Sequence, residues 1–299
     1  MTWTAFLLVF VSVFLHVSWN MLSKSVRPSV AFFAIMSLTG SAVWLGFFAF
    51  SNLRLAELSS GFWWLLAASV FGELLYMLGL ARAYKRGDIS LVYPVVRALP
   101  VLMVAAITML TGFGTSLSAT AVAGMVLISA GCLVMPLARF GDFRFSNYWN
   151  RTIAFVVLGA IGTTIYTIVD KGATGIMRDE VAGFGVGCTL SYLFMIELGL
   201  CVGEFAFVAF SRQERRAFRV IMRRPLYPLL AGVCSSSAYG LVLLAMNFVT
   251  NVSYIQAFRQ LSLPLGFVAG VMILKERSGA PKLAGVAMIV AGLLLVALG

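Results

Sequence analysis

The sequence predicts an all-α polytopic membrane protein, with ten transmembrane helices arranged as two inverted five-helix repeats. The first indication is composition, because 61% of the residues are hydrophobic and only 11% are charged, whereas soluble domains carry about 25% charged residues. The second is the length of the apolar runs, which matches the roughly 20 residues that a helix needs to cross a bilayer. The third is an internal repeat that relates the two halves of the chain.

Apolar segments separated by short polar breaks define the expected spans. They cover residues 3–23, 30–50, 61–83, 89–110, 117–137, 152–171, 183–209, 226–248, 252–273 and 281–298. The first segment has no basic leader region and continues as HVSWN, so we expect a retained span rather than a cleaved signal peptide. The predicted organisation is a first repeat at 1–138, a connecting loop at 139–151 and a second repeat at 152–299.

The two halves share a pattern of proline, glycine and aromatic residues. The start of span four, ISLVYPVVRALP, aligns with the start of span nine, VSYIQAFRQLSLP. The matched residues are Pro100 with Pro264, Gly124 with Gly285, Gly131 with Gly292, and Tyr76 with Tyr239. Because each half holds an odd number of spans, the halves insert in opposite orientations, as in many secondary transporters.

Basic residues predict the orientation of the chain in the membrane. Most of the 22 lysines and arginines fall in loops after odd-numbered spans, whereas loops after even-numbered spans contain Arg54, Lys171 and Arg178. Since positively charged loops stay in the cytoplasm, we expect the odd-numbered loops inside and both termini outside a cell (inner) membrane. The net charge of +11 therefore reflects topology rather than nucleic-acid binding, for which no recognisable module is present.

The residues quoted above, together with the closing stretch LSLPLGFVAGVMILKERSGAPKLAGVAMIVAGLLLV, resemble the drug/metabolite transporter superfamily of the EamA type. The match includes Pro264, Glu276, Gly285 and Gly292, and it extends in layout over essentially the whole chain, although Gly112 stands where the first repeat of the family has a glutamate. The resemblance implies export or exchange of small metabolites, amino acids or drugs, driven by a proton or counter-substrate gradient.

Span one carries a polar stripe on one helix face. Its members are Ser12, His16, Trp19, Asn20 and Ser23, and the corresponding stripe of span six is Thr163, Tyr166, Thr167 and Asp170. Polar residues within a membrane face protein or water, so one interpretation is a cavity wall that binds substrate and a proton. The other is that His16 and Asn20 form hydrogen bonds between packed helices.

Two arginines and a glutamate lie at membrane depth. Glu73 is in span three, Arg97 is in span four and Arg259 is in span nine. Glu73 and Arg97 form either a structural ion pair or a separated pair that grips the ammonium and carboxylate of a zwitterion. The aromatic walls that would hold a cation are Tyr76, Tyr93, Tyr166, Tyr239 and Trp19.

Further candidates lie on span seven and in the longest basic loop. Glu197 is either a proton-binding site or a paired carboxyl that faces another helix, and Glu204 follows it two helical turns later. The run 211–225, SRQERRAFRVIMRRP, predicts an amphipathic anchor on anionic headgroups.

We therefore expect a secondary active transporter of a small polar metabolite, amino-acid-like or carrying an anionic group, that works by alternating access. The predicted substrate-binding residues are His16, Trp19, Asn20, Glu73, Tyr76, Tyr93, Arg97, Tyr166, Tyr239, Gln256 and Arg259. His16, Glu73 and Glu197 are the candidates for proton coupling. Pro94, Pro100 and Pro264 are the candidates for kinks and gating.

The alternatives are a flippase for a lipid-linked headgroup and a multidrug or cation exporter, with an intramembrane enzyme as the weakest. No cofactor, metal site or catalytic residue is expected, because the chain has one histidine and no motif for hydrolysis or nucleotide binding. The four cysteines, Cys132, Cys188, Cys201 and Cys234, lie in predicted spans and indicate buried small hydrophobic residues. The expected partners are the lipid bilayer and a small substrate, with the chain as a monomer or homodimer.

Overall fold

The computed structural model describes residues 1–24, 29–51, 53–86, 89–137, 139–142, 151–275 and 279–299. Within these ranges, the side chains of residues 24, 84–86, 89–95, 151 and 273–274 lie outside the description. The described part of the chain is all-helical and contains no β-strand. The predicted all-α class is confirmed.

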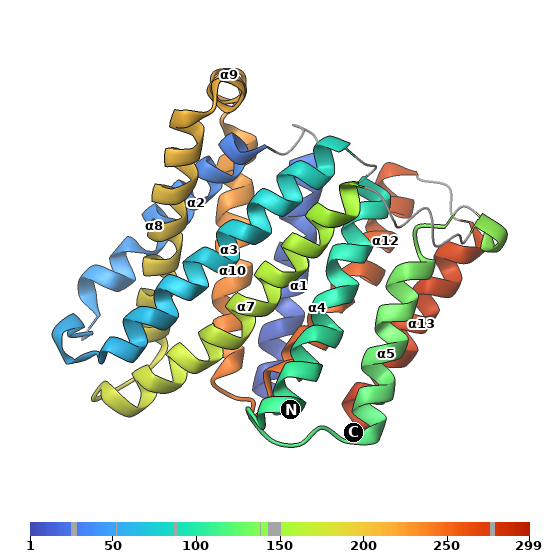
Figure 1. Cartoon of the computed structure of the whole chain (residues 1–299), viewed down its shortest axis with the longest axis horizontal. Helices are drawn as coiled ribbons and strands as arrows, with labels where there is room; N and C mark the ends of the chain where they lie inside the picture. Colours follow the sequence, from blue (N-terminus) through green and yellow to red (C-terminus); the bar gives the residue numbers. More distant parts are fainter. Residues whose placement is uncertain (25–28, 52, 87–88, 138, 143–150, 276–278) are drawn as a thin grey trace.

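Long apolar helices make up most of the described chain (Figure 1). They are α1 (Trp3–Lys24), α2 (Val30–Phe50), α3 (Ser60–Arg86), α4 (Ile89–Thr111), α5 (Ala119–Val134), α7 (Arg151–Glu180), α8 (Val186–Phe210), α9 (Arg212–Ile221), α10 (Leu226–Met246), α11 (Val252–Phe258), α12 (Ser262–Leu274) and α13 (Ala280–Leu298), with short 3-10 helices η1 (Leu55–Glu57), η2 (Phe140–Asp142) and η3 (Arg259–Leu261). Among the described residues, seven helices are long and apolar enough to cross a membrane, namely α1, α2, α3, α7, α8, α10 and α13. Shorter apolar stretches lie at Val96–Thr111 in α4 and in α5. These helices are compatible with a membrane-embedded protein.

The helices pack mainly in pairs whose members are far apart in the sequence (Figure 1). α3 lies along α7, α2 along α8, α1 along α10, and α5 along α13. α4 contacts both α7 and α5. Each of the four long pairs joins a helix from the first half of the chain to one from the second half, so the two halves share one packed bundle.

Glycines allow α5 and α13 to approach closely. A Cβ atom at Gly124 would lie 2.5 Å from the carbonyl oxygen of Gly292, and one at Gly131 would lie 2.7 Å from that of Gly285. Because the earlier glycine of α5 faces the later glycine of α13, the two helices run antiparallel. Small residues at such crossings let the backbones of membrane helices pack tightly. The glycines that match between the halves of the sequence therefore meet in one interface.

The predicted span 252–273 is not a single helix. It consists of α11, the 3-10 turn η3 and α12. Pro264 lies in the first turn of α12 and has no amide hydrogen to donate to the carbonyl of Gln260, so a continuous α-helix is interrupted there. The interruption places Arg259 and Gln260 inside the bundle, at a change of helix type.

α4 behaves differently from this broken segment. It runs without interruption from Ile89 to Thr111, past Pro100. The side chain of Pro94 lies outside the described residues. Bending and gating at Pro94, Pro100 and Pro264 stay predictions.

The predicted span 152–171 continues for more than two further turns, because α7 ends at Glu180. Lys171 is therefore helical rather than part of a loop. Its Nζ donates to the carbonyls of Met246 and Val249, both at 2.8 Å. A cation at the carboxyl end of a helix satisfies carbonyls that have no partner within the helix, so Lys171 fixes the end of α10.

α9 lies at one end of the bundle, and both chain termini lie at the other (Figure 1). The Ser211 hydroxyl accepts a hydrogen bond from the Glu214 amide at 3.3 Å and so caps α9. Glu214 Oε2 in turn accepts from the Ala31 amide at 3.1 Å, at the start of α2. The predicted amphipathic segment 211–225 thus contains a helix that is docked on α2 by a buried carboxylate.

Replacing Gly131 with valine should separate α5 from α13, because the new side chain would overlap the Gly285 carbonyl and Ile289. We expect a loss of about 1–3 kcal/mol, the usual cost of overpacking, seen as a lower melting temperature of the detergent-purified protein. Gly46→Val is the matched control, since a Cβ at Gly46 meets nothing within 4 Å. Equal melting temperatures for the two variants would contradict the role of the glycine interface.

Candidate functional site

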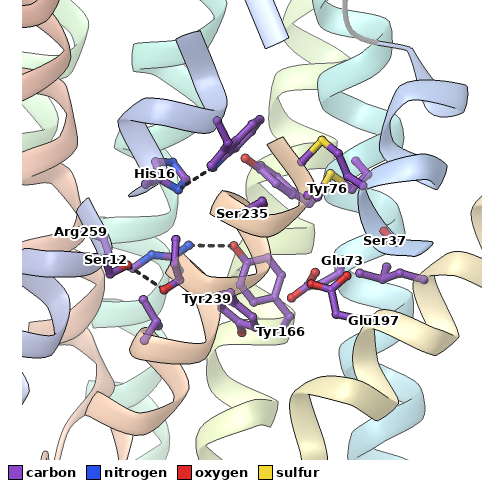
Figure 2. A pocket seen from close by; sticks show the side chains of 17 residues that line it. Ser12, His16, Ser37, Glu73, Tyr76, Tyr166, Glu197, Ser235, Tyr239 and Arg259 are labelled. Carbon is purple, nitrogen blue, oxygen red and sulfur yellow. Dashed lines mark hydrogen bonds between the residues drawn. The ribbon is translucent and has the colours of Figure 1, made fainter. Parts of the chain in front are cut away.

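A cavity of about 50 Å³ lies inside the bundle and is lined by polar and apolar residues from both halves of the chain (Figure 2). One enclosed water molecule needs roughly 10–15 Å³, so the cavity has room for a few waters. The lining residues are Ser12, His16, Trp19, Met36, Ser37, Glu73, Tyr76, Met77, Tyr166, Glu197, Leu200, Gly232, Ser235, Ala238, Tyr239, Val242 and Arg259. They come from α1, α2, α3, α7, α8, α10 and η3.

Arg259 forms the cationic wall of the cavity. The break in the predicted ninth span places it at the start of η3, where its side chain is 7% exposed. Its Nη1 donates to Gln256 Oε1 at 3.3 Å, and its Nη2 donates to Tyr166 Oη at 3.4 Å. The guanidinium also lies 6.0 Å from the ring centre of Tyr166 and 5.7 Å from that of Tyr239. These long contacts hold the cation while leaving donors directed at the cavity.

Glu73 and Glu197 form the opposite, acidic wall. Figure 2 shows both carboxyl groups on the side of the cavity away from Arg259. Glu197 fits only because residue 40 is glycine, since a Cβ there would lie 2.6 Å from the Glu197 carboxyl carbon. Within the described part of the chain, neither carboxyl has a hydrogen-bond donor or an ion-pair partner.

Three tyrosines fill the space between the two walls. The rings of Tyr76 and Tyr166 meet edge to face at 6.1 Å, and those of Tyr166 and Tyr239 at 5.5 Å. This edge-to-face geometry is favourable for aromatic pairs. The resulting cluster joins α3, α7 and α10 and keeps the guanidinium apart from the carboxyls.

Asp170 anchors the tyrosine cluster from behind. It lies one turn beyond Tyr166 on α7 and is fully buried. Its Oδ1 accepts from the hydroxyl of Tyr192 at 2.7 Å, and its Oδ2 accepts from the hydroxyl of Tyr239. Asp170 does not line the cavity, but it ties α7, α8 and α10 together at one boundary of it.

His16 lies on α1 between two hydrogen-bond donors. Its Nδ1 accepts from Trp19 Nε1 at 3.1 Å, and its Nε2 is 3.4 Å from Arg97 Nη1. A neutral imidazole accepts at only one nitrogen, so the tautomer decides whether the ring accepts from Trp19 or from Arg97. The geometry favours a role in positioning Trp19 and the cavity wall.

Arg97 does not line the cavity. Its Nε donates to Gln260 Oε1 at 3.1 Å, and its Nη2 donates to the Arg259 carbonyl at 2.6 Å and to Ser262 Oγ at 3.0 Å. None of these described bonds reaches Glu73. Arg97 therefore ties α4 to the broken segment, and Arg259 is the arginine that faces the site.

Other residues predicted for the site lie around it. Asn20 Nδ2 donates to the His16 carbonyl of its own helix at 2.7 Å. Gln256 is buried and positions Arg259 rather than lining the cavity. The side chain of Tyr93 lies outside the described residues.

Small and apolar lining residues escaped the sequence analysis. Ser37 and Ser235 contribute hydroxyls to the cavity, and Met36 and Met77 contribute flexible apolar surface. A single serine in an apolar helix carries no periodic signal, because serine is common in membrane helices. Ser37 donates a hydrogen bond to the buried Glu204, and because the two residues are far apart in the sequence, only the structure reveals this contact.

Metal binding has no support among the described residues, where no group of three or more His, Cys, Asp or Glu residues is placed to hold an ion. Cys132, Cys188, Cys201 and Cys234 are free thiols. The site thus offers charge, hydroxyls and aromatic rings for recognition.

Comparison with known proteins supports the fold. No model of a known protein family matches the chain, and no curated protein matches it. A solved crystal structure aligns with 100% of this chain and 98% of its own, with a TM-score of 0.71 and 16% sequence identity. At this identity the likeness shows the fold alone, so the function has to be inferred from the site.

The two buried arginines should respond differently to neutralisation. Arg97→Gln leaves the Arg259 carbonyl and Gln260 without their charged donor, so we expect a loss of about 3 kcal/mol or more in a denaturant titration of the purified protein. Arg259→Gln should cost less stability, because its contacts are longer and partly aromatic. Arg54→Gln, at an exposed arginine, is the control, and a larger loss for Arg259→Gln than for Arg97→Gln would refute this division of roles.

Proposed function

We propose that the protein is a secondary active transporter of small zwitterionic metabolites, and that amino acids are the simplest substrate class. The observation that carries the proposal is the opposition of Arg259 to Glu73 and Glu197 across the cavity (Figure 2). A guanidinium binds a carboxylate through paired hydrogen bonds, and a carboxylate together with tyrosine faces binds an ammonium group. A ligand with only a cationic group would leave Arg259 unmatched, which disfavours a general cation exporter.

The architecture that we propose is a pair of inverted five-helix repeats with ten membrane spans. The helix pairs support this, because α1 packs on α10 as α3 packs on α7, each pair joining the first helix of one half to the third helix of the other. Second helices pair as α2 with α8, and last helices as α5 with α13. A two-fold axis in the membrane plane would produce these pairings.

Alternating access follows from the size of the cavity. A volume of about 50 Å³ admits a few waters, so an amino acid enters only after the walls separate. We propose that the bonds from Tyr192 and Tyr239 to Asp170 close the cavity toward the end that carries the termini. Opening on that side would then require Asp170 to release one tyrosine.

The proposed orientation keeps the basic loops and α9 in the cytoplasm and both termini outside the cell membrane. The four arginines of α9, Arg212, Arg215, Arg216 and Arg219, lie at the end opposite the termini (Figure 1). Anionic lipids of the cytoplasmic leaflet attract such clusters.

Ligand-dependent thermal stabilisation tests the substrate class, since a ligand that binds the folded state raises the melting temperature. Free amino acids should stabilise the purified protein, whereas their methyl esters and N-acetyl derivatives should not, because each lacks one charge. Arg259→Gln should weaken binding about 10- to 100-fold, the effect of losing a charged hydrogen bond of roughly 1.5–3 kcal/mol. Arg54→Gln should bind normally, and equal stabilisation by an amino acid and its ester would exclude the zwitterion site.

Proton coupling is proposed for Glu73 and Glu197, since two carboxylates on one wall repel when both are ionised. The other titratable and charged groups facing them are Tyr76, Tyr166, Tyr239 and Arg259, with Asp170 behind and Glu204 further along α8. In proteoliposomes, each single variant, Glu73→Gln or Glu197→Gln, should abolish stimulation of amino-acid uptake by a pH gradient. Exchange of labelled for unlabelled amino acid should persist at saturating substrate with a higher KM, because the other carboxyl still faces the cavity to bind the ammonium. Loss of exchange in folded variants, or gradient stimulation equal to that of the native protein, would contradict this role.

A further inference from the structure

One cavity residue leads to a buried carboxyl group that the substrate site does not include. Ser37 on α2 lines the cavity, and its hydroxyl donates to Glu204 Oε2 at 2.8 Å. Glu204, on α8, is 1% exposed. This carboxyl group therefore lies one hydrogen bond behind the cavity surface.

The second oxygen of this group has no matching donor. Within the described part of the chain, Glu204 Oε1 is buried and has no hydrogen-bond partner. A buried polar atom without a partner costs roughly 1–3 kcal/mol, and a charged one costs more. A hydroxyl or amide side chain could link α2 to α8 by the same hydrogen bond. Packing alone therefore does not explain the desolvation cost of burying a carboxyl group here.

The position of Glu204 extends the acidic wall along α8. Glu197 lines the cavity, and Glu204 follows seven residues later on the same helix face, about 10 Å further along the axis. That direction leads toward α9 and the end of the bundle opposite the termini (Figure 1). Glu204 thus lies between the cavity and the end that we place in the cytoplasm.

We propose that Glu204 is a proton-binding site that exchanges protons with the cavity through the hydroxyl of Ser37. This inference rests on the proposed function, because it gives the coupling proton a route between the cavity and the cytoplasmic end. In the inward step, the Ser37 hydroxyl hydrogen moves to Glu204 Oε2, and Ser37 Oγ takes a proton from a hydronium ion or a protonated carboxyl in the cavity. The serine regains its hydroxyl, so one proton is transferred in all.

The surroundings of Glu204 contain no described cation that would hold it as an ion pair. The titratable groups on the elements packed around it are Glu73 and Arg82 on α3, Glu197 and Cys201 on α8, and Glu214 with the four arginines of α9. Arg82 lies over the ring of Phe207, 5.7 Å from its centre, and among the described residues it forms no ion pair with Glu204. Glu214 is engaged with the Ala31 amide. α10 contributes Tyr239, which is bonded to Asp170.

Infrared difference spectroscopy tests this site directly, because a protonated carboxyl has a carbonyl stretching band that an ionised one lacks. The native protein in lipid vesicles should gain such a band when the buffer is changed from mildly alkaline to mildly acidic. Glu204→Gln should remove one component of the band. Ser37→Ala should keep that component but slow its appearance several-fold after a rapid pH change, which a purely structural carboxyl would not show.

Glu57→Gln is the matched control, since Glu57 is a surface carboxyl in η1. An identical band in Glu204→Gln and the native protein, or an unchanged rate in Ser37→Ala, would overturn the proposal. If the infrared test fails while amino acids still stabilise the protein, the proton relay through Ser37 is wrong but the transporter proposal stands. If Glu204 titrates but the protein binds no amino acid, the proposed amino-acid transport is wrong and the proton-binding site stands.

Discussion

The placement of two guanidinium groups inside an apolar bundle is the constraint on which the site depends. A charge at membrane depth costs several kcal/mol unless it meets polar partners. The α-helix is interrupted by η3 just before Pro264, and at this break the Arg259 carbonyl accepts from Arg97. Arg97 is satisfied by the broken segment itself, so it fixes the backbone from which the Arg259 side chain reaches the cavity. Arg97 thus has a structural role, and Arg259 is the arginine that lines the cavity.

Close packing between the halves gives this arrangement its rigidity. Glycines bring α3 against α7 and α5 against α13, so polar faces of α1 and α7 meet at one space rather than facing lipid. Two tyrosines connect the groups that this packing brings together. Tyr166 contacts the guanidinium with both its hydroxyl and its ring, and Tyr239 links the guanidinium to Asp170. Cation, aromatic and carboxylate are thus positioned by helices rather than by loops.

The sequence predicted where the helices lie along the chain better than it predicted the direction of their side chains. Hydropathy predicted the apolar helices. His16, Glu73, Tyr166 and Arg259, which the sequence analysis selected, line one cavity, and their role in binding stays a prediction. Depth alone could not separate Arg97 from Arg259, because their roles depend on which way each side chain points around its helix. The prolines predicted a break or a bend in spans four and nine without deciding between them, since a proline in an apolar segment is compatible with either.

Tyr239 is the residue through which ligand binding would reach the closed side of the cavity. Its ring lies 5.7 Å from the Arg259 guanidinium, while its hydroxyl is bonded to Asp170. A carboxylate bound by Arg259 would compete with the ring for the cation, and an ammonium at Glu73 would compete with the Tyr239 hydroxyl for the Asp170 carboxylate. Both effects weaken the hold of the cluster only when one molecule carries both charges. In the proposed cycle, a zwitterion therefore favours opening more than either charge alone.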